Sequence, residues 1–458
     1  MSENHRFGGG AAESSLSPVV LVALLVAVVL IFLLPRRFLV VPFLSVAFLV
    51  PIGQTLVVGG VHLFVARIVI LAGLSRLVTA KFSGTGSLFA GGFNSIDKVF
   101  ACWAVAQALA FMILYNQTAA IVNQLGFLWD SLGGYFLLRF AIHDEEDIRR
   151  ATKVFAVIAL IAAVAMVNEQ WTRSNVFGFI GGISRPDIRD GKVRSQGPFS
   201  HAILAGVYAA TIVPLFLRLW SSKKDRLFAL VGILGAITMV IACGSSTPLG
   251  ACVAAIGALC LWPLRRNMRT LRWGLVVTVL GLALVMKAPV WFILAHIDLV
   301  GGSSSYHRAL LVDTCIRRFG DWWLLGASNN DKWGWDMWDV QNEFVAQALR
   351  GGLTSLVLFI MIVSRAFGRL GIARKSVETN RPNAWLMWTL GAVILGHVVA
   401  FFGADYFDQT KYWWYASLAI VSAATAPLLT KSKKPMAVEL SSEDPGIMQF
   451  SPYQIAPK

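Results

Sequence analysis

Apolar stretches of about 17–25 residues recur along the chain and are separated by short polar segments. A helix of about 20 apolar residues crosses roughly 30 Å of hydrocarbon, and the stretches lack the short alternating pattern of barrel strands. We therefore expect an all-α fold, a polytopic transmembrane helix bundle with about 12–13 spans. The expected spans are residues 18–34, 38–57, 61–77, 99–115, 119–140, 152–167, 202–220, 227–243, 248–264, 274–293, 342–364, 383–402 and 412–429.

Two of the polar segments, residues 168–200 and 296–341, are much longer than the others. Long connections are usually functional or disordered, and the second is rich in tryptophan and aspartate rather than in disorder-promoting residues. Within it, apolar residues at helical spacing predict an amphipathic helix: Leu310, Leu311, Cys315, Ile316 and Phe319. Residues 1–458 are thus expected to form a single integral membrane domain with a large loop between late spans.

Composition supports a membrane protein, and the charge pattern gives it an orientation. Hydrophobic residues make up 56% of the chain, charged residues 14%, and the mean hydropathy is +0.65. The basic residues behind the net charge of +15 are not gathered in one patch suited to nucleic acid. They fall in alternate loops, as expected if these loops are cytoplasmic, where basic residues are favoured. This parity puts the tail, residues 431–458, in the cytoplasm and segments 168–200 and 296–341 outside.

Cofactor and metal motifs are not evident in the sequence. The five cysteines show no paired spacing, so neither a disulfide framework nor a zinc site is indicated. A glycine-rich phosphate loop is also missing, so we expect no ATP-driven activity and no cofactor or metal.

The first long segment ends in a cluster of cations on the side where basic residues are disfavoured. An anion site explains this placement, since a guanidinium can bind phosphate oxygens through two parallel hydrogen bonds. The alternative is that the cations pair with Asp187, Asp190 or lipid headgroups. The candidate anion-binding residues are Arg185, Arg189, Lys192 and Arg194.

The second long segment supplies Arg308 as another candidate anion ligand, with a solvated helix-start charge as the alternative. His307 and His201 each lie near a candidate arginine, which makes them candidate bases. Tryptophans of this segment could stack on sugar rings or form an interfacial aromatic belt. Within one predicted span, Asp130 and Arg139 are expected to pair with each other.

These residues resemble a known family. The run Arg194-Ser-Gln-Gly197-Pro-Phe199-Ser-His201, which opens a predicted span, resembles the arginine, glycine, aromatic and histidine stretch of the O-antigen ligase and polymerase superfamily. The family's large outer loop and its exit into the next span are similar to a second set: Tyr306-His307-Arg308, Leu325-Gly326, Asn342, Phe344 and Gly352. The resemblance covers roughly residues 168–365.

The resemblance implies a multispan glycosyltransferase of the bacterial inner membrane, with its active site on the periplasmic side. Its partners would be an undecaprenyl-pyrophosphate-linked glycan donor, a glycan acceptor, the bilayer, and possibly a flippase and a chain-length regulator, without nucleic acid, nucleotide sugar or essential metal. By this likeness Arg194 and Arg308 would bind the donor pyrophosphate, while His307 and then His201 would be the leading base candidates. Substrate-binding roles would fall to Arg185, Arg189, Lys192, Gln341, Asn342 and Glu343.

One departure favours a polymerase over a ligase. Ligases carry histidine immediately before the asparagine, whereas this chain has Gln341, and an amide cannot act as a base. A polymerase of O-antigen or exopolysaccharide repeats is therefore expected, with an O-antigen ligase as the alternative. A transporter of lipid-linked sugar is the alternative from another class. It is disfavoured because the polar residues cluster at one surface rather than at the bilayer midplane.

Overall fold

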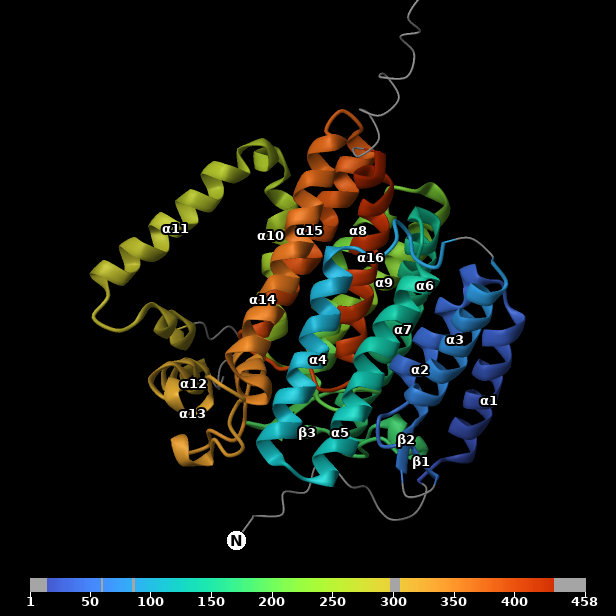
Figure 1. The fold of residues 1–458 in the computed structure, drawn as a ribbon, viewed down its shortest axis with the longest axis horizontal. Helices are drawn as coiled ribbons and strands as arrows, with labels where there is room; N and C mark the ends of the chain where they lie inside the picture. The colour runs from blue at the N-terminus through green and yellow to red at the C-terminus, as the bar shows by residue number, and fades with distance from the viewer. Residues whose placement is uncertain (1–14, 59–60, 85–86, 297–304, 432–458) are drawn as a thin grey trace, which may run out of the picture.

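The computed structural model describes residues 15–58, 61–84, 87–296 and 305–431, and most of these residues are helical (Figure 1). Seven helices among them are long and apolar enough to cross a membrane, in agreement with an all-α membrane protein. They are α4 (Ser95–Tyr115), α7 (Glu145–Thr172), α8 (Ala202–Leu219), the stretch Lys223–Ala242 with α9 (Arg226–Ala242), the stretch Trp262–Val285 with α11 (Met268–Val285), α14 (Glu343–Ser376) and α15 (Arg381–Phe401).

Other predicted spans also coincide with helices. Three of these are complete helices: α1 (Pro18–Leu33), α10 (Ser246–Cys260) and α16 (Thr410–Lys431). The predicted span 119–140 is continuous but contains a π-turn, and it consists of α5 (Thr118–Leu128), η2 (Trp129–Gly133) and α6 (Gly134–Ala141). Residues 297–304 of the predicted large loop and 432–458 of the predicted tail lie outside the described residues.

The predicted helices 38–57 and 61–77 are wrong where they approach each other. Helix α2 (Val40–Leu49) ends before Pro51, because a proline disfavours helical backbone in the residue before it. Two short strands follow, β1 (Thr55–Val58) and β2 (Val61–Phe64), which pair antiparallel and are rich in β-branched residues. Helix α3 (Val65–Phe82) starts directly after β2.

Helix α8 lies at the centre of the bundle and is almost completely buried. It packs against α9, α10 and α15, and small residues allow the close approach. A Cβ atom on Gly206 would lie 2.5 Å from Sγ of Cys243. Aromatic rings fill the space on its other side, where Tyr208 contacts Phe48, Phe155 and Trp413.

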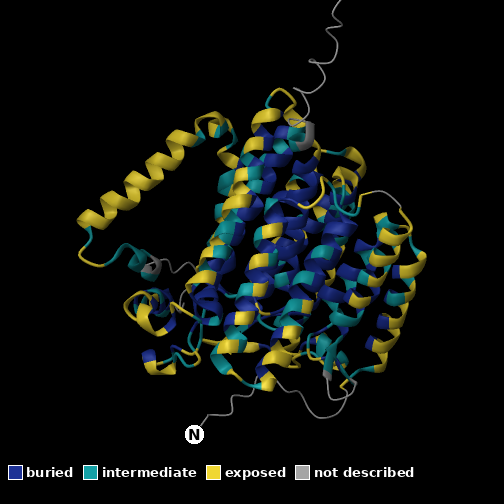
Figure 2. Ribbon diagram, in the orientation of Figure 1, coloured by how far each residue is buried: buried dark blue, intermediate teal, exposed yellow. Residues whose placement is uncertain are grey.

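Helix α11 differs from the rest of the bundle because none of its residues, Met268–Val285, is buried. It leans away from α14 and α10 in Figure 1, and Figure 2 shows it exposed along its length. Its exposed side chains are largely apolar, including Leu275, Val277 and Leu284. Such a surface is stable in contact with lipid rather than with water.

Asp130 and Arg139 form ion pairs inside the bundle, but not with each other as the sequence predicted. Arg139 binds Asp97, with Nε 2.9 Å from Oδ1 and both side chains fully buried. Asp130 instead binds Arg67 at 3.0 Å and Lys411 at 3.2 Å. An Asp130–Arg139 pair is wrong because residues nine apart lie on roughly opposite sides of an α-helix.

Several of the basic loops expected in the cytoplasm meet at one end of the bundle. Arg36 is 3.4 Å from Asp147, and Arg149 forms an ion pair with Asp225 in the connection between α8 and α9. Further along the chain, Arg266 binds Glu378 at 2.9 Å. We call this end the basic end.

The opposite end, which we call the polar end, carries residues 173–201, 305–342 and 402–409. The expected helix is present as α12 (Ser305–Arg317), followed by α13 (Phe319–Trp322). Of the apolar residues that predicted it, Leu311 and Cys315 are buried, whereas Ile316 and Phe319 are exposed. Both pack on the start of α14 through a separate small apolar core: Leu311, Cys315, Trp322, Trp333, Met337, Val345, Ala348 and Leu349. Trp322 and Trp333 are thus packing residues, whereas Trp335 and Trp338 are exposed.

Two glycines fasten this region to a kink in α14. Gly351 and Gly352 have non-helical backbone, and Gly352 has φ +67°. The amide of Leu353 donates to the carbonyl of Trp323 at 2.8 Å, and a Cβ atom on Gly352 would lie 2.6 Å from the Leu324 carbonyl oxygen. Gly326 similarly approaches the Leu349 carbonyl. The close backbone approach explains why these positions need glycine.

We expect Gly352→Ala to destabilise the protein by about 1–3 kcal/mol, because alanine at this φ is strained and its Cβ meets a carbonyl. Thermal unfolding of purified protein and proteolysis of the 305–342 region measure the effect. Gly368→Ala in the same helix is the matched control, since nothing lies within 4 Å of its added Cβ. Equal stability of the two variants would show that the kink does not hold this region.

Candidate functional site

The cations of the first long segment lie on a β-hairpin at the polar end. Strands β3 (Asp187–Arg189) and β4 (Lys192–Arg194) pair through a two-residue turn, Asp190 and Gly191, both with positive φ. An Asp-Gly pair is typical of such turns because both positions need left-handed backbone. The side chains of Arg185, Arg189 and Lys192 are exposed.

Arg194 is the exception among these cations, because only 7% of its surface is exposed. It lies opposite Asp187 in the hairpin, and its Nη1 atom donates to Asp187 Oδ2 at 2.9 Å. The ion pair with Asp187, one of the two alternatives for this cluster, is thus present. The side chain of Asp187 is 53% exposed, so the ion pair is accessible from the surface on the Asp187 side.

The backbone on either side of Arg194 is held by the carboxyl end of α7. Glu169 Oε2 accepts hydrogen bonds from the amides of Gln196 at 3.1 Å and Gly197 at 2.9 Å. Gln170 Nε2 donates to the Val193 carbonyl at 2.9 Å and to Ser195 Oγ at 3.0 Å. These bonds fix the backbone that carries Arg194.

His201 caps the start of α8, where its Nδ1 accepts a hydrogen bond from the Ile203 amide at 3.2 Å. Burial, followed by the charge of Arg194, lowers the pKa of His201 below its ordinary value. The imidazole is therefore neutral at pH 7. The charges of Asp187, Asp339 and Asp405 act in the opposite direction, which places His201 near all three polar segments.

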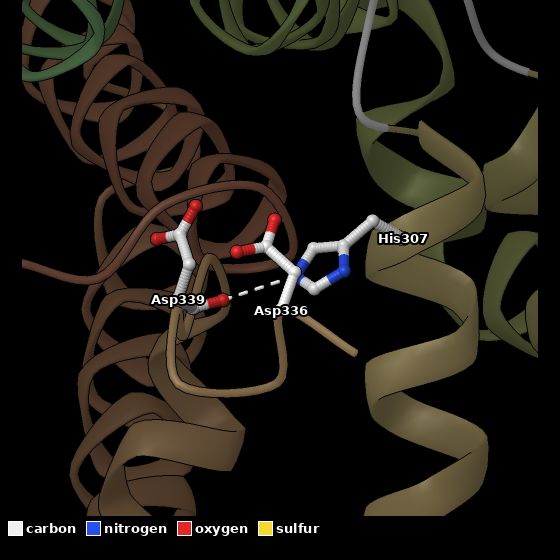
Figure 3. A group of neighbouring side chains, drawn as sticks. All are labelled: His307, Asp336 and Asp339. Carbon is white, nitrogen blue, oxygen red and sulfur yellow. Dashed lines mark hydrogen bonds between the residues drawn. The ribbon is translucent and has the colours of Figure 1, made fainter. Parts of the chain in front are cut away.

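His307 and Arg308 lie in the first turn of α12. Arg308 is buried, with 8% of its surface exposed. The Nε2 atom of His307 lies 3.0 Å from the carbonyl oxygen of Asp339 (Figure 3). Asp336 and Asp339 are neighbours of this imidazole, and one ligand atom from each of the three residues lies within 4.8 Å of the others. The sequence did not predict this grouping, because His307 is far from the aspartates along the chain.

Gln341, Asn342 and Glu343 join this region to the bundle. Gln341 donates to the carboxylate of Asp339. Asn342 caps α14 by accepting from the Val345 amide at 3.1 Å. The buried carboxylate of Glu343 accepts from Gln347 at 2.7 Å and from the Tyr406 amide at 2.6 Å. In this structure Asn342 and Glu343 therefore bind neighbouring elements of the protein.

The connection between α15 and α16, residues 402–409, is a third part of the site that the sequence reasoning missed. Asp408 accepts from the Ser200 amide at 3.1 Å, and burial raises the pKa of Asp408 to about 6. Asp405 binds Arg350 at 2.7 Å, and burial raises its pKa although Arg350 lowers it. The sequence does contain one indication of this part of the site, because two aspartates occur in the short connection between two predicted spans.

A groove of about 340 Å³ lies between α7 and α9, next to this region. Its lining is largely apolar and includes Leu160, Val164 and Leu234, with Asn168 and Trp171 near the end of α7. The next residues along α7, Glu169 and Gln170, are those that hold the backbone around Arg194. The end of the groove at Asn168 and Trp171 therefore lies near the backbone that carries Arg194.

No protein-family model matches the sequence. A search of curated proteins also gives no significant match.

Proposed function

We propose that this chain is a metal-independent, inverting membrane glycosyltransferase. It would polymerise undecaprenyl-pyrophosphate-linked oligosaccharide repeats of an O-antigen or exopolysaccharide at the periplasmic face of the bacterial inner membrane. The observation that carries the proposal is the pair of buried arginines, Arg194 and Arg308, at one end of a membrane-type bundle. In a membrane, guanidinium groups at the end of such a bundle would lie near the lipid headgroups, where they are suited to a lipid-linked diphosphate.

The chemistry asks two things of the protein. The anomeric carbon of the donor sugar carries a good leaving group, so the protein must stabilise the charge that grows on the departing pyrophosphate. It must also orient the acceptor hydroxyl for attack. Arg194 and Arg308 serve the first task, with Arg185, Arg189 and Lys192 attracting the anion, and Gln341 supports the second. A single displacement inverts the configuration of that carbon.

Exchange of partners at Arg194 fits this mechanism. The carboxylate of Asp187 binds the guanidinium of Arg194 and is itself half exposed. A diphosphate carries more charge than a carboxylate and offers more oxygens, so it can displace Asp187. The apolar groove between α7 and α9 supplies a place beside it for part of the lipid chain.

A transporter of lipid-linked sugar is less consistent with the arrangement of charges. Transporters keep ionisable residues near the midplane to bind their cargo. Here Asp97 and Asp130 within the bundle are each bound to basic side chains of the protein, whereas the candidate ligands gather at the polar end. This arrangement favours a reaction at the membrane surface over transport of a lipid-linked sugar through the bundle.

The choice between polymerase and ligase rests on Gln341, which replaces the histidine of ligases. Incubation of the purified chain with donor alone separates the two, because a polymerase uses a second donor molecule as acceptor. We expect products longer by whole repeats. Product that forms only when a lipid A-core acceptor is added would identify a ligase instead.

The proposal requires the polar end to face the periplasm and the basic end the cytoplasm. We expect a membrane-impermeant thiol reagent to label Asp190→Cys and Trp338→Cys in intact cells, because both positions are exposed. Lys224→Cys at the basic end should react only after the cells are opened. The native cysteines are first replaced by serine or alanine. Labelling of Lys224→Cys in intact cells would show that the protein has the opposite orientation in the membrane.

A histidine base would remove a proton from the acceptor hydroxyl, and such a base contributes about 10²–10⁴ in rate. We expect His307→Ala or His201→Ala to lower the rate of glycan transfer by that factor, with unchanged amounts of protein in the membrane. Near-normal product from both variants would show that no histidine base is needed. Such a result is compatible with the good leaving group.

A further inference from the structure

We propose that His307, Asp336 and Asp339 bind one divalent cation of the Mn²⁺ or Zn²⁺ type. The ion would join α12 to the segment that leads into α14. This structural role goes beyond the glycosyl transfer proposed above, which requires no metal.

The three side chains come from two separate parts of the chain and face a common point. One ligand atom from each lies within 4.8 Å of the others, and all three residues are partly buried. In Figure 3 both carboxylates lie on the side of the imidazole that faces the Asp339 carbonyl. That carbonyl oxygen is 3.0 Å from Nε2 of His307. This distance is that of a hydrogen bond, so an ion would replace the bond and draw the ligand atoms to within roughly 3.0–3.4 Å of one another, the spacing set by bond lengths of about 2.1 Å.

The electrostatic surroundings give an independent reason for a cation. Among the residues that the structure describes, neither Asp336 nor Asp339 forms an ion pair. Other aspartates of the polar end differ, because Asp313 binds Arg317 and Asp405 binds Arg350. Two neighbouring carboxylates repel each other, and a divalent cation between them removes that cost.

The frame around the three ligands is already ordered by packing. Met337, between the two aspartates, is 1% exposed, and Trp333 is buried and donates from Nε1 to Asp321 at 3.2 Å. These residues belong to the small apolar core beneath α12 and α14. Ligands held by packed neighbours lose little freedom when they bind an ion, and their partial exposure leaves room for water to complete the coordination shell.

The ligand set indicates the class of metal. Carboxylate and carbonyl oxygens suit Mg²⁺, Ca²⁺ and Mn²⁺, whereas an imidazole suits Zn²⁺ and other transition metals. A mixed site of two carboxylates and one imidazole therefore fits Mn²⁺ or Zn²⁺. Binding through Nε2 would replace the hydrogen bond that this atom donates to the Asp339 carbonyl and would use the nitrogen lone pair, so in the loaded protein His201 would be the remaining histidine base candidate.

Mn²⁺ binding to the purified full-length chain tests the site without any assay of activity. The protein is stripped of metal in a nonionic detergent and titrated with MnCl₂ while electron paramagnetic resonance measures free Mn²⁺. We expect one bound ion at micromolar Mn²⁺, with nitrogen modulation from the imidazole in pulsed spectra. His307→Ala should abolish the nitrogen modulation and weaken binding at least 10-fold.

Aspartate variants complete the test. Asp336→Asn and Asp339→Asn keep the shape of the side chain, and asparagine tolerates the φ of +61° at position 336. Each should weaken Mn²⁺ binding 10- to 100-fold. Asp331→Asn, an exposed carboxylate nearby, is the matched control and should bind as the original chain does. Binding only at millimolar Mn²⁺, binding without nitrogen modulation, or equal binding by all variants would overturn the proposal.

Discussion

Arg194→Ala should lower glycan transfer by about 10- to 150-fold at matched membrane levels. This range corresponds to the loss of one charge-assisted interaction worth roughly 1.5–3 kcal/mol. Arg308→Ala should have a similar effect, because its guanidinium is also buried at the polar end. Lysine should rescue either position poorly, since an ammonium group cannot form two parallel hydrogen bonds to a diphosphate.

The ion pair with Asp187 provides the control that separates a functional arginine from a structural one. If Arg194 acts only by binding Asp187, then Asp187→Ala should reduce transfer as much as Arg194→Ala. If Arg194 binds the donor, Asp187→Ala removes a competitor and should leave transfer equal or higher. Product formation and protein amount are measured together for both variants. An equal loss of transfer in the two variants would show that Arg194 acts by stabilising the hairpin.

Arg139→Leu should destabilise the protein by about 3–5 kcal/mol, because it leaves the Asp97 carboxylate buried without its partner. Arg139 also donates to the carbonyls of Gly92 at 3.1 Å and Ala90 at 3.2 Å, so the connection before α4 loses its anchor as well. Thermal unfolding in detergent measures the loss. The double variant Asp97→Asn with Arg139→Leu should recover part of the stability.

Arg266→Ala is the matched control for this prediction. Its pair with Glu378 is exposed, with 72% of the arginine side chain accessible, so its loss should cost no more than about 1 kcal/mol. Similar unfolding temperatures for Arg139→Leu and Arg266→Ala would contradict a structural role for the buried pair.

Hydropathy predicted most of the helical plan, because crossing a membrane demands long apolar helices whatever their neighbours are. It failed at residues 50–64, where apolar β-branched residues after Pro51 form a hairpin and not a span. The prediction that Asp130 pairs with Arg139 was also wrong. Their partners, Arg67, Lys411 and Asp97, lie on other elements, and no local pattern predicts which helices will pack together.

The candidate site was predictable only in part. Cations on the side that the charge pattern predicts to be non-cytoplasmic indicated Arg194, and its proximity along the chain indicated His201. The sequence could not show that Asp187 would bind Arg194, or that Glu343 would bind the backbone of Tyr406. Asp339, Asp405 and Asp408 were missed because each gains its importance from contacts between segments that are distant along the chain.

Turnover of a lipid-linked donor by the purified chain tests the central proposal most directly. The protein is reconstituted in liposomes with an undecaprenyl-pyrophosphate oligosaccharide, and glycan length and released lipid pyrophosphate are measured together. We expect one lipid pyrophosphate to be released for each repeat added, and both products to form about 10- to 150-fold more slowly with Arg194→Ala. Donor that crosses the membrane unchanged, or donor left intact in the presence of both possible acceptors, would contradict a glycosyltransferase.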